Sequence, residues 1–194
     1  MSLVQSDIRQ SILDTTRVLL VKFGYNSLSM RKIANKTGCA LGTIYLYFEN
    51  KDVLIHSLID EGFEKMYQLI LNKVNQYQEP EKRLEIFCRQ YVNFGISNPE
   101  YYEIMYLLHP ERMNRYPKDK FRRARRTLEL ISNILEELAE KRGIIIKDSK
   151  LQSYSIWASL HGVITILLAR RLDKKVDQNE FIETVIHKAV RSAI

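Results

Sequence analysis

The stretch TGCALGTIYLYFENK contains the side chains of this chain whose types and spacing best suit a chemical task. A glycine-containing turn is followed by a short predicted helix that carries Thr43, Tyr45 and Tyr47, and Lys51 opens the next helix. Hydroxyl and ammonium groups at this spacing can bind phosphate oxygens, and a threonine methyl can contact a base edge. Gly42 lets the backbone approach a ligand closely. This chemistry suits a nucleic-acid duplex.

Two short helices must position these side chains. Ser29 can act as the N-cap of the first helix, Gly38 ends it, and residues 40–48 predict the second helix. The second helix is too short to be stable alone, so we expect Ile44 and Phe48 to hold it by packing inward.

A longer amphipathic helix is predicted before them over residues 8–23, with Gly24 as its stop. Its inward face is formed by Ile8, Ile12, Thr16, Leu19, Leu20 and Phe23. Two short helices braced by a third form the helix-turn-helix arrangement, in which the second short helix enters the major groove. Taken alone, Tyr45 and Tyr47 fit an aromatic stripe in a helical core equally well, so the prediction depends on the whole combination.

The rest of the sequence also has a helical pattern. Caps and first-turn prolines mark the helix starts, at Asn50, Pro80, Pro99, Asp148 and Asp177. Apolar periodicity predicts helices near residues 50–74, 80–96, 99–108, 118–141, 149–171 and 178–192. No strand pattern appears, so we expect an all-α fold of about nine helices. We expect a helix-turn-helix domain over residues 1–50 and a helical domain over residues 51–194, with residues 51–75 as the bridging helix.

Composition limits the class of protein. With 45% hydrophobic residues, seven glycines and four prolines among 194 residues, the chain looks soluble and helix-rich. No run of about 18 apolar residues and no signal-peptide pattern occurs, so we expect a cytoplasmic protein without a membrane partner. Cys39 and Cys88 are expected to be buried free thiols, and the scattered histidines predict no metal site. No phosphate loop, nucleophile elbow or carboxylate pair stands out, so we do not expect an enzyme.

The net charge of +7 is concentrated in the first 52 residues and in residues 110–126. The most basic segment is residues 118–126, KDKFRRARR. We interpret it as a solvated helix face around an inward Phe121 and Ala124. An acidic effector, a membrane surface and an auxiliary DNA contact are the alternatives.

The middle of the chain is rich in aromatic and methionine side chains. Most should belong to the core, and some could line an apolar pocket with a few polar tips. Trp157 and His161 lie four residues apart on one predicted helix, where His161 suits a hydrogen-bonded core or interface residue better than a ligand contact. The candidate pocket residues are Phe87, Tyr91, Phe94, Tyr102, Met105, Tyr106, Met113, Trp157 and His161.

The predicted helix over residues 149–171 is apolar on two sides. One stripe carries Leu151, Tyr154, Ala158, Thr165 and Leu168, and the other carries Ile156, Leu160, Val163 and Leu167. Together with the apolar face of residues 178–192, these stripes predict pairing with a second copy in a four-helix bundle, and therefore a homodimer.

Over about residues 5–58 the sequence resembles the tetracycline-repressor (TetR) family of bacterial transcriptional regulators. The residues that carry the resemblance, in the family's order and spacing, are Phe23, Gly24, Tyr25, Ser29, Ile33, Ala34, Gly38, Gly42, Thr43, Ile44, Tyr45, Tyr47, Phe48, Asn50, Lys51 and Leu54. Beyond this region the resemblance rests on chain length, helix count and the stretch WASLHG at residues 157–162.

The resemblance implies an all-helical homodimer that binds double-stranded operator DNA with palindromic half-sites. It also implies a repressor whose C-terminal helices bind an unidentified small-molecule effector and release the DNA, with no cofactor. By resemblance Ser29, Tyr45, Tyr47 and Lys51 would contact phosphates, and Arg31 and Thr43 would read bases.

Three positions depart from the family pattern, because Ala40, Leu41 and Leu46 stand where polar residues are common. Leu41 and Leu46 nevertheless belong, with Gly42, to the expected DNA-facing set. These departures predict sparse direct base readout, with apolar contacts to thymine methyls and DNA shape contributing more. They also leave open an alternative function, that of a helical interaction protein with weakened or lost DNA binding.

Overall fold

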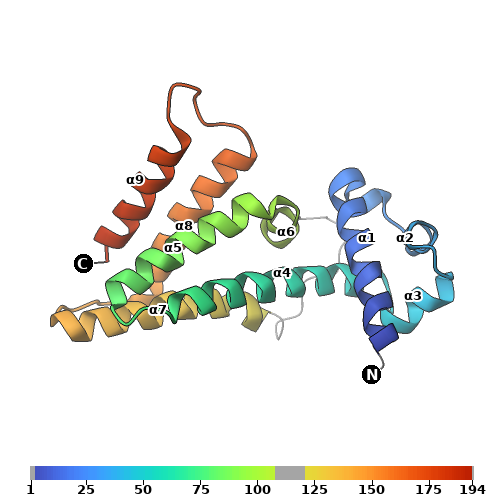
Figure 1. Ribbon diagram of the computed structural model, residues 1–194, viewed down its shortest axis with the longest axis horizontal. Helices are drawn as coiled ribbons and strands as arrows, with labels where there is room; N and C mark the ends of the chain where they lie inside the picture. Colours follow the sequence, from blue (N-terminus) through green and yellow to red (C-terminus); the bar gives the residue numbers. More distant parts are fainter. Residues whose placement is uncertain (1–2, 108–120, 194) are drawn as a thin grey trace. The chain divides into compact units, whose positions relative to one another are not determined.

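The computed structural model describes residues 3–107 and 121–193, which are all-helical (Figure 1). The helices are α1 (Leu3–Ser27), α2 (Met30–Thr37), α3 (Leu41–Tyr47), α4 (Lys51–Val74), α5 (Pro80–Ser97), α6 (Pro99–Tyr102), the π-helical turn η1 (Glu103–Leu107), α7 (Phe121–Arg142), α8 (Ser149–Leu168) and α9 (Gln178–Arg191). These residues contain nine α-helices and no strand, which confirms the predicted all-α class.

The described residues divide into two compact units. The first unit contains the described residues 3–63 and 100–107, and the second contains residues 64–99 and 121–193. The first unit contains α1, α2, α3 and the first half of α4, and the second contains α5, α7, α8 and α9. The predicted domain boundary after residue 50 stays a prediction.

The helix starts follow from local hydrogen bonds that the sequence predicted. Oγ of Ser29 accepts from the backbone N–H of Lys32 at 3.2 Å, and Oδ1 of Asn50 accepts from the N–H of Val53 at 3.0 Å. Asp148 and Asp177 cap α8 and α9 in the same way, at 2.8 Å each. These four side chains satisfy backbone donors that the first helical turn leaves unpaired.

Two glycines set the geometry of the helix-turn-helix. Gly38 has a left-handed backbone (φ 77°) and ends α2, as predicted. Gly24 also has a positive φ, of 73°, with ψ 165°, and this non-helical backbone ends the regular helix there, as predicted. A short further turn up to Ser27 follows this kink within α1.

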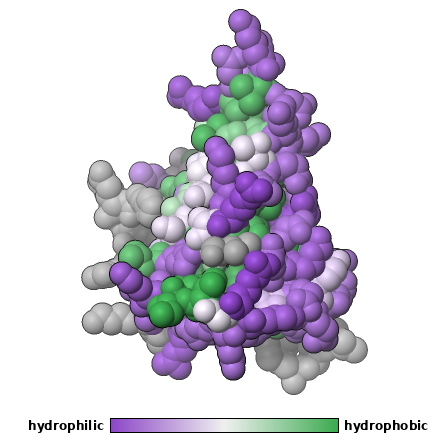
Figure 2. All heavy atoms as spheres, turned by 90° about the vertical axis from the view of Figure 1, so that its left-hand side faces the viewer, coloured by the Kyte–Doolittle hydropathy of each residue, from purple (hydrophilic) through white to green (hydrophobic). Residues whose placement is uncertain are grey.

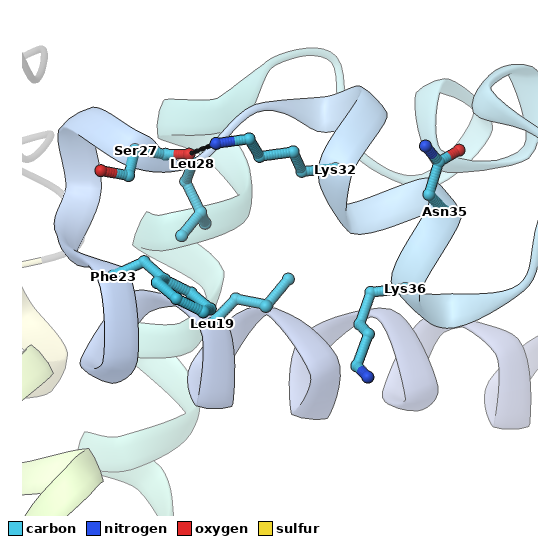
Figure 3. A pocket seen from close by; sticks show the side chains of 7 residues that line it. All are labelled: Leu19, Phe23, Ser27, Leu28, Lys32, Asn35 and Lys36. Atoms are coloured by element: carbon cyan, nitrogen blue, oxygen red, sulfur yellow. Dashed lines mark hydrogen bonds between the residues drawn. The ribbon is translucent and has the colours of Figure 1, made fainter.

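The core of the first unit is apolar and continuous along its helices. Its buried side chains include Ile12, Leu13, Leu20, Leu28, Met30, Ile33, Ile44, Phe48, Leu54, Ile55 and Leu58. The prediction that Phe23 faces inward was wrong, because its side chain is 53% exposed. Its neighbours on α2 are polar and do not cover the ring (Figure 3).

In the second unit, α5 packs against α7, α8 and α9, and α8 packs against α7 and α9. The close approach of α5 and α8 depends on Gly95, because a Cβ atom at this position would lie 2.7 Å from Cδ1 of Ile164. Ile131, Ile134, Leu135 and Leu160 fill the centre of this unit.

The predicted helix over residues 99–108 changes type. Pro99 starts α6, which lasts one turn, and the backbone then widens into η1. The wider turn keeps Tyr102, Ile104 and Met105 buried together. Residue 108 lies outside the described residues.

Candidate nucleic-acid interface

Helix α3 has a buried side and an exposed side. Ile44 is fully buried and Phe48 directly follows the helix with 1% exposure, which confirms that packing holds this short helix. On the other side, Tyr45 is 50% exposed and Leu46 is 84% exposed. Thr43 and Tyr47 are half-buried between the two sides. The major groove of DNA is wide enough to admit an α-helix by such an exposed edge.

The start of α3 differs from the starts of the other short helix and of α4. Ala40 offers no side-chain cap, and the backbone N–H of Thr43 donates instead to the Ala40 carbonyl at 2.9 Å. Leu41 and Gly42 at this end are exposed. The position of α3 therefore depends on its packed side rather than on a cap.

The start of α2 presents further predicted contact residues. Ser29 and Arg31 are both exposed. Because Oγ of Ser29 acts as acceptor in the cap, its hydroxyl proton stays available to donate to a phosphate oxygen. The positive end of the α2 dipole favours an anion at the same place.

Lys51 makes internal contacts that the sequence did not predict. Its Nζ donates to the carbonyl of Tyr25 at 3.1 Å and to the carbonyl of Leu28 at 3.3 Å, and it lies 3.7 Å from the centre of the Tyr25 ring. These contacts use two of the three N–H donors of a lysine. Burial lowers the pKa of the ammonium group. Lys51 thus ties the start of α4 to the connection between α1 and α2.

Tyr25 and Asp52 complete the same cluster. The hydroxyl of Tyr25 donates to Oδ1 of Asp52, and the ring is 7% exposed. Burial, followed by the hydrogen bond to Asp52, raises the pKa of Tyr25 to about 12. Tyr25, Lys51 and Asp52, which we call the α1–α4 clamp, fix the backbone just before Ser29. The sequence signal for it was weak, because two of its acceptors are backbone carbonyls.

The candidate pocket residues fall in both units. Phe87, Tyr91, Phe94, Trp157 and His161 belong to the second unit, and Tyr102, Met105 and Tyr106 belong to the first. Met113 lies outside the described residues. Within the first unit, the rings of Tyr102 and Tyr106 lie 4.8 Å apart, centre to centre. The assignment of these nine residues to one pocket stays a prediction.

In the second unit, three of these residues contact one another in sequence: Tyr91 of α5, Trp157 of α8 and His161 of α8. Nε1 of Trp157 donates to the hydroxyl of the buried Tyr91 at 2.8 Å. The His161 ring stacks on the Trp157 ring with centres 5.0 Å apart. Burial lowers the pKa of His161, so the neutral imidazole is favoured.

The basic run of residues 118–126 is only partly described. Residues 118–120 and the side chains of Phe121 and Arg123 lie outside the described residues. Arg122 and Arg125 are exposed. Arg126 forms an ion pair with Glu64 at 2.9 Å and lies 3.9 Å from the centre of the Tyr67 ring. Arg126, one arginine of the run, therefore connects α7 to α4.

Within this chain, helix α8 buries most of one predicted apolar stripe and exposes most of the other. Ile156, Leu160 and Val163 are buried, whereas Leu151 is 66% exposed and Tyr154 is 45% exposed. On the face of the molecule in Figure 2, apolar residues gather in green patches among hydrophilic ones. Within the described residues, α8 is the one helix long and apolar enough to cross a membrane by composition alone, a test that core helices also pass.

The cysteines carry free thiols, as expected, although Cys39 is only half-buried. Burial raises the pKa of Cys88 to about 12, which leaves its thiol protonated. No cluster of three or more potential metal ligands occurs among the residues that the structure describes.

The fold and the two-sided α3 define a helix-turn-helix protein of the kind that binds DNA. Residues 12–58 match the family model for bacterial regulatory proteins of the tetR family, and residues 84–189 match the Tetracyclin repressor-like C-terminal domain. The chain belongs to the TetR family.

Two relatives are similar in sequence to parts of this chain. An uncharacterized HTH-type transcriptional regulator from Haemophilus influenzae is 33% identical over 107 residues, which cover 51% of this chain and 56% of that protein. The HTH-type transcriptional repressor KstR from Rhodococcus jostii is 39% identical over 62 residues, which cover 32% and 29%. The chain thus matches about half or less of the length of these two relatives.

The crystal structure of the transcriptional regulator FadR from Bacillus subtilis, in complex with stearoyl-CoA, has the same fold. It aligns with a TM-score of 0.75 at 20% identity, over 95% of this chain and 98% of that one. At this identity the likeness concerns the fold alone.

Proposed function

We propose that this protein is a homodimeric transcriptional repressor that binds operator DNA and leaves it when a small-molecule effector binds. The observation that carries the proposal is the two-sided α3, held by Ile44 and Phe48 with Tyr45 and Leu46 outward. Family membership and the similarity to the repressor KstR support the same function. We also propose that it acts in the cytoplasm and has no catalytic role.

We propose that some of the DNA-facing residues contact phosphates and that others contact bases. Ser29, Tyr45 and Tyr47 donate hydrogen bonds to phosphate oxygens, and Arg31 reads a base edge. Leu46, at 84% exposure, offers an apolar surface to a thymine methyl. Arg31→Ala should therefore relax specificity by about 1–3 kcal/mol at one base pair of each half-site. Fluorescence anisotropy measures this change, with the DNA that lies upstream of the gene for this protein (the upstream DNA) and with single-base variants of it.

Lys32→Ala is the matched control for Arg31→Ala, because Lys32 is the next exposed cation on α2 and its Nζ is bound to the Ser27 carbonyl. Removing this positive charge, which reads no base, should weaken DNA binding to all sequences alike. If Arg31→Ala also weakens all sequences equally, Arg31 binds phosphate and does not read a base.

Dimerisation is proposed to use α8 and α9. The exposed apolar stripe of α8, with Leu151 and Tyr154, would otherwise face water. Light scattering should find a dimer for the wild-type chain and a monomer for the double variant Leu151→Glu, Tyr154→Glu. A wild-type monomer at micromolar concentration would exclude this part of the proposal.

The effector is proposed to be an acyl-coenzyme A thioester. The support is the shared fold with a FadR that holds stearoyl-CoA, together with the aromatic side chains Phe87, Tyr91, Phe94 and Trp157 in the second unit. Stearoyl-CoA should release the protein from its upstream DNA, whereas free coenzyme A should not, because it lacks the apolar chain. Release by both compounds, or by neither, would rule out stearoyl-CoA as the effector.

A second candidate function is a helical interaction protein that has lost DNA binding. The observation that favours it is the apolar exposed edge of α3 at Leu41 and Leu46, which would also suit a protein partner. A salt-dependent shift of the upstream DNA distinguishes the two candidates, because a protein-binding surface does not require phosphate contacts.

A further inference from the structure

A groove of about 540 Å³ lies between α1 and α2 in the first unit, and none of its lining residues is among those proposed to bind the effector. This volume is within the range of roughly 300–1,000 Å³ typical of small-molecule sites. The groove is lined by Leu19, Phe23, Ser27, Leu28, Lys32, Asn35 and Lys36, all of which the structure describes (Figure 3).

The floor of this α1–α2 groove is apolar. Leu28 points from the connection between the two helices toward Phe23 and Leu19 of α1 (Figure 3). Phe23 is 53% exposed although it is a large aromatic residue. An apolar chain laid on this floor would remove the ring from water, a contribution of the order expected for burying about half of a phenylalanine.

The rim of the groove is basic. Lys32 and Lys36 border it from α2, and no acidic side chain is among the seven lining residues. Nζ of Lys32 donates to the Ser27 carbonyl at 2.8 Å, which holds this ammonium group at the end of the groove nearest Leu28. Lys22 does not line the groove, but its Nζ lies 5.3 Å from the centre of the Phe23 ring. An apolar floor with cations at its edge is complementary to an anionic amphiphile.

We propose that the α1–α2 groove binds a small anionic amphiphile. Its apolar chain lies on Leu19, Phe23 and Leu28, and its carboxylate lies against Lys36 and Lys32. This site is separate from the effector site of the second unit and does not depend on the identity of that effector. A neutral amphiphile lacks the partner for the rim, and a cationic one is repelled by it.

Three chain-matched probes test the charge requirement on the full-length protein. Octanoate, octyl glucoside and octyltrimethylammonium are titrated while methyl NMR signals of Leu19 and Leu28 are followed. We expect octanoate to shift both signals saturably, octyl glucoside to bind about fivefold more weakly, and the cation to leave both unchanged. Equal binding of the three probes would overturn the proposal.

The indole N–H signal of Trp157, the single tryptophan, reports on the second unit in the same spectra. Octanoate that shifts this signal while leaving Leu19 and Leu28 unchanged binds elsewhere, and that result would also overturn the proposal. Saturable shifts at Leu19 and Leu28 with weaker or separate changes at Trp157 support it.

Two variants assign the binding to the groove. Phe23→Ala should weaken octanoate binding about tenfold, because it removes the only aromatic side chain of the apolar floor. Lys36→Ala should weaken it about fivefold by removing the cation, without touching the core. If Phe23→Ala does not fold, Lys36→Ala decides alone. Matched controls are Val18→Ala, an exposed apolar position of α1 outside the groove, and Lys73→Ala, an exposed lysine of α4. Unchanged affinity in Phe23→Ala or Lys36→Ala, or equal losses in the controls, would contradict the site.

Discussion

The two compact units differ in how deeply their polar side-chain contacts are buried. In the first unit, the α1–α4 clamp joins Tyr25, Lys51 and Asp52 at a junction of helices, where Tyr25 is buried. In the second unit, ion pairs lie along the exposed edges of an apolar core. Among them are Arg83–Glu137, Arg89–Glu183, Lys141–Glu79 and Arg142–Glu81.

This difference follows from helix length. Helices α2 and α3 have eight and seven residues, too few to be stable alone or to fix their own orientation. Polar contacts of defined geometry, such as those of Lys51 with two carbonyls, supply that orientation. Helices α5, α7 and α8 are 18 to 22 residues long and bury broad apolar faces, so charges at their edges add little.

The largest expected effect concerns the packed side of α3. Phe48→Ala should destabilise the protein by about 3–5 kcal/mol, because the ring is 1% exposed and its loss leaves a cavity. Tyr45→Ala, on the exposed side of the same helix, should change stability by about 0.5 kcal/mol or less. Urea unfolding followed by circular dichroism measures both values. Comparable losses in the two variants would show that α3 does not have the two sides described.

Substitutions at Gly95 in the second unit and at Gly62 in the first unit test how tightly the helices pack around each position. A Cβ atom at Gly95 would lie 2.7 Å from two branches of Ile164, which is rigid, so Gly95→Ala should cost about 1–3 kcal/mol. At Gly62 the closest atom would be Sδ of Met105 at 2.6 Å, and a methionine can move aside. Gly62→Ala should therefore cost clearly less. Thermal unfolding of the two variants tests this order, and a larger loss for Gly62→Ala would reverse the comparison.

Removing one hydrogen bond tests the α1–α4 clamp. Tyr25→Phe should cost about 1–2 kcal/mol, because Asp52 loses a donor while the ring stays packed. The raised pKa of Tyr25 also predicts a pH dependence. The unfolded chain loses this proton near pH 10 and the folded chain near pH 12. The contribution of the Tyr25 hydroxyl to the free energy of unfolding is therefore fully present below about pH 10 and is lost as the pH rises from 10 to 12.

Unfolding free energies of wild type and Tyr25→Phe, measured from pH 8 upward, isolate this contribution. The difference between the two proteins should shrink as the pH rises above about 10. A difference that stays constant up to pH 12 would mean that Tyr25 does not titrate as its burial implies.

The smallest expected effect is at the edge of the second unit. Arg89→Ala removes the pairing with Glu183 and Glu85, and these carboxylates are partly exposed. We expect a loss of about 1 kcal/mol or less, which high salt should reduce further. A loss as large as that of Phe48→Ala would show that the ion pairs of this unit matter as much as its apolar core.

Much of the fold could be predicted because its signals are local. Ser29, Asn50, Asp148 and Asp177 cap the helices that follow them, and spacing alone placed Ile44 and Phe48 inside. These features depend on residues within about one helical turn of each other.

The failures involve contacts between distant residues. Periodicity placed Phe23 on the inward face of α1, but it does not show that the facing side of α2 is polar and leaves a groove. The partners of Lys51 are carbonyls 26 and 23 residues away, which no side-chain pattern reveals. The candidate pocket, which includes residues of both units, stays a prediction, because aromatic content does not indicate which helices pack together.

The central claim is that the exposed edge of α3 and the start of α2 bind the phosphates of duplex DNA. Its most direct test is the affinity for the upstream DNA as a function of salt, for wild type, Tyr47→Phe and Lys51→Ala. The wild-type log K should fall linearly with log salt, by about 0.9 per neutralised phosphate. Tyr47→Phe should weaken binding to all sequences alike. Lys51 at the start of α4 has two of its three N–H donors bound to the Tyr25 and Leu28 carbonyls, and we expect the third to bind a phosphate, so Lys51→Ala should also make the salt dependence shallower by about one phosphate per half-site. Wild-type binding that is absent or independent of salt, or affinities unchanged in both variants, would contradict the claim.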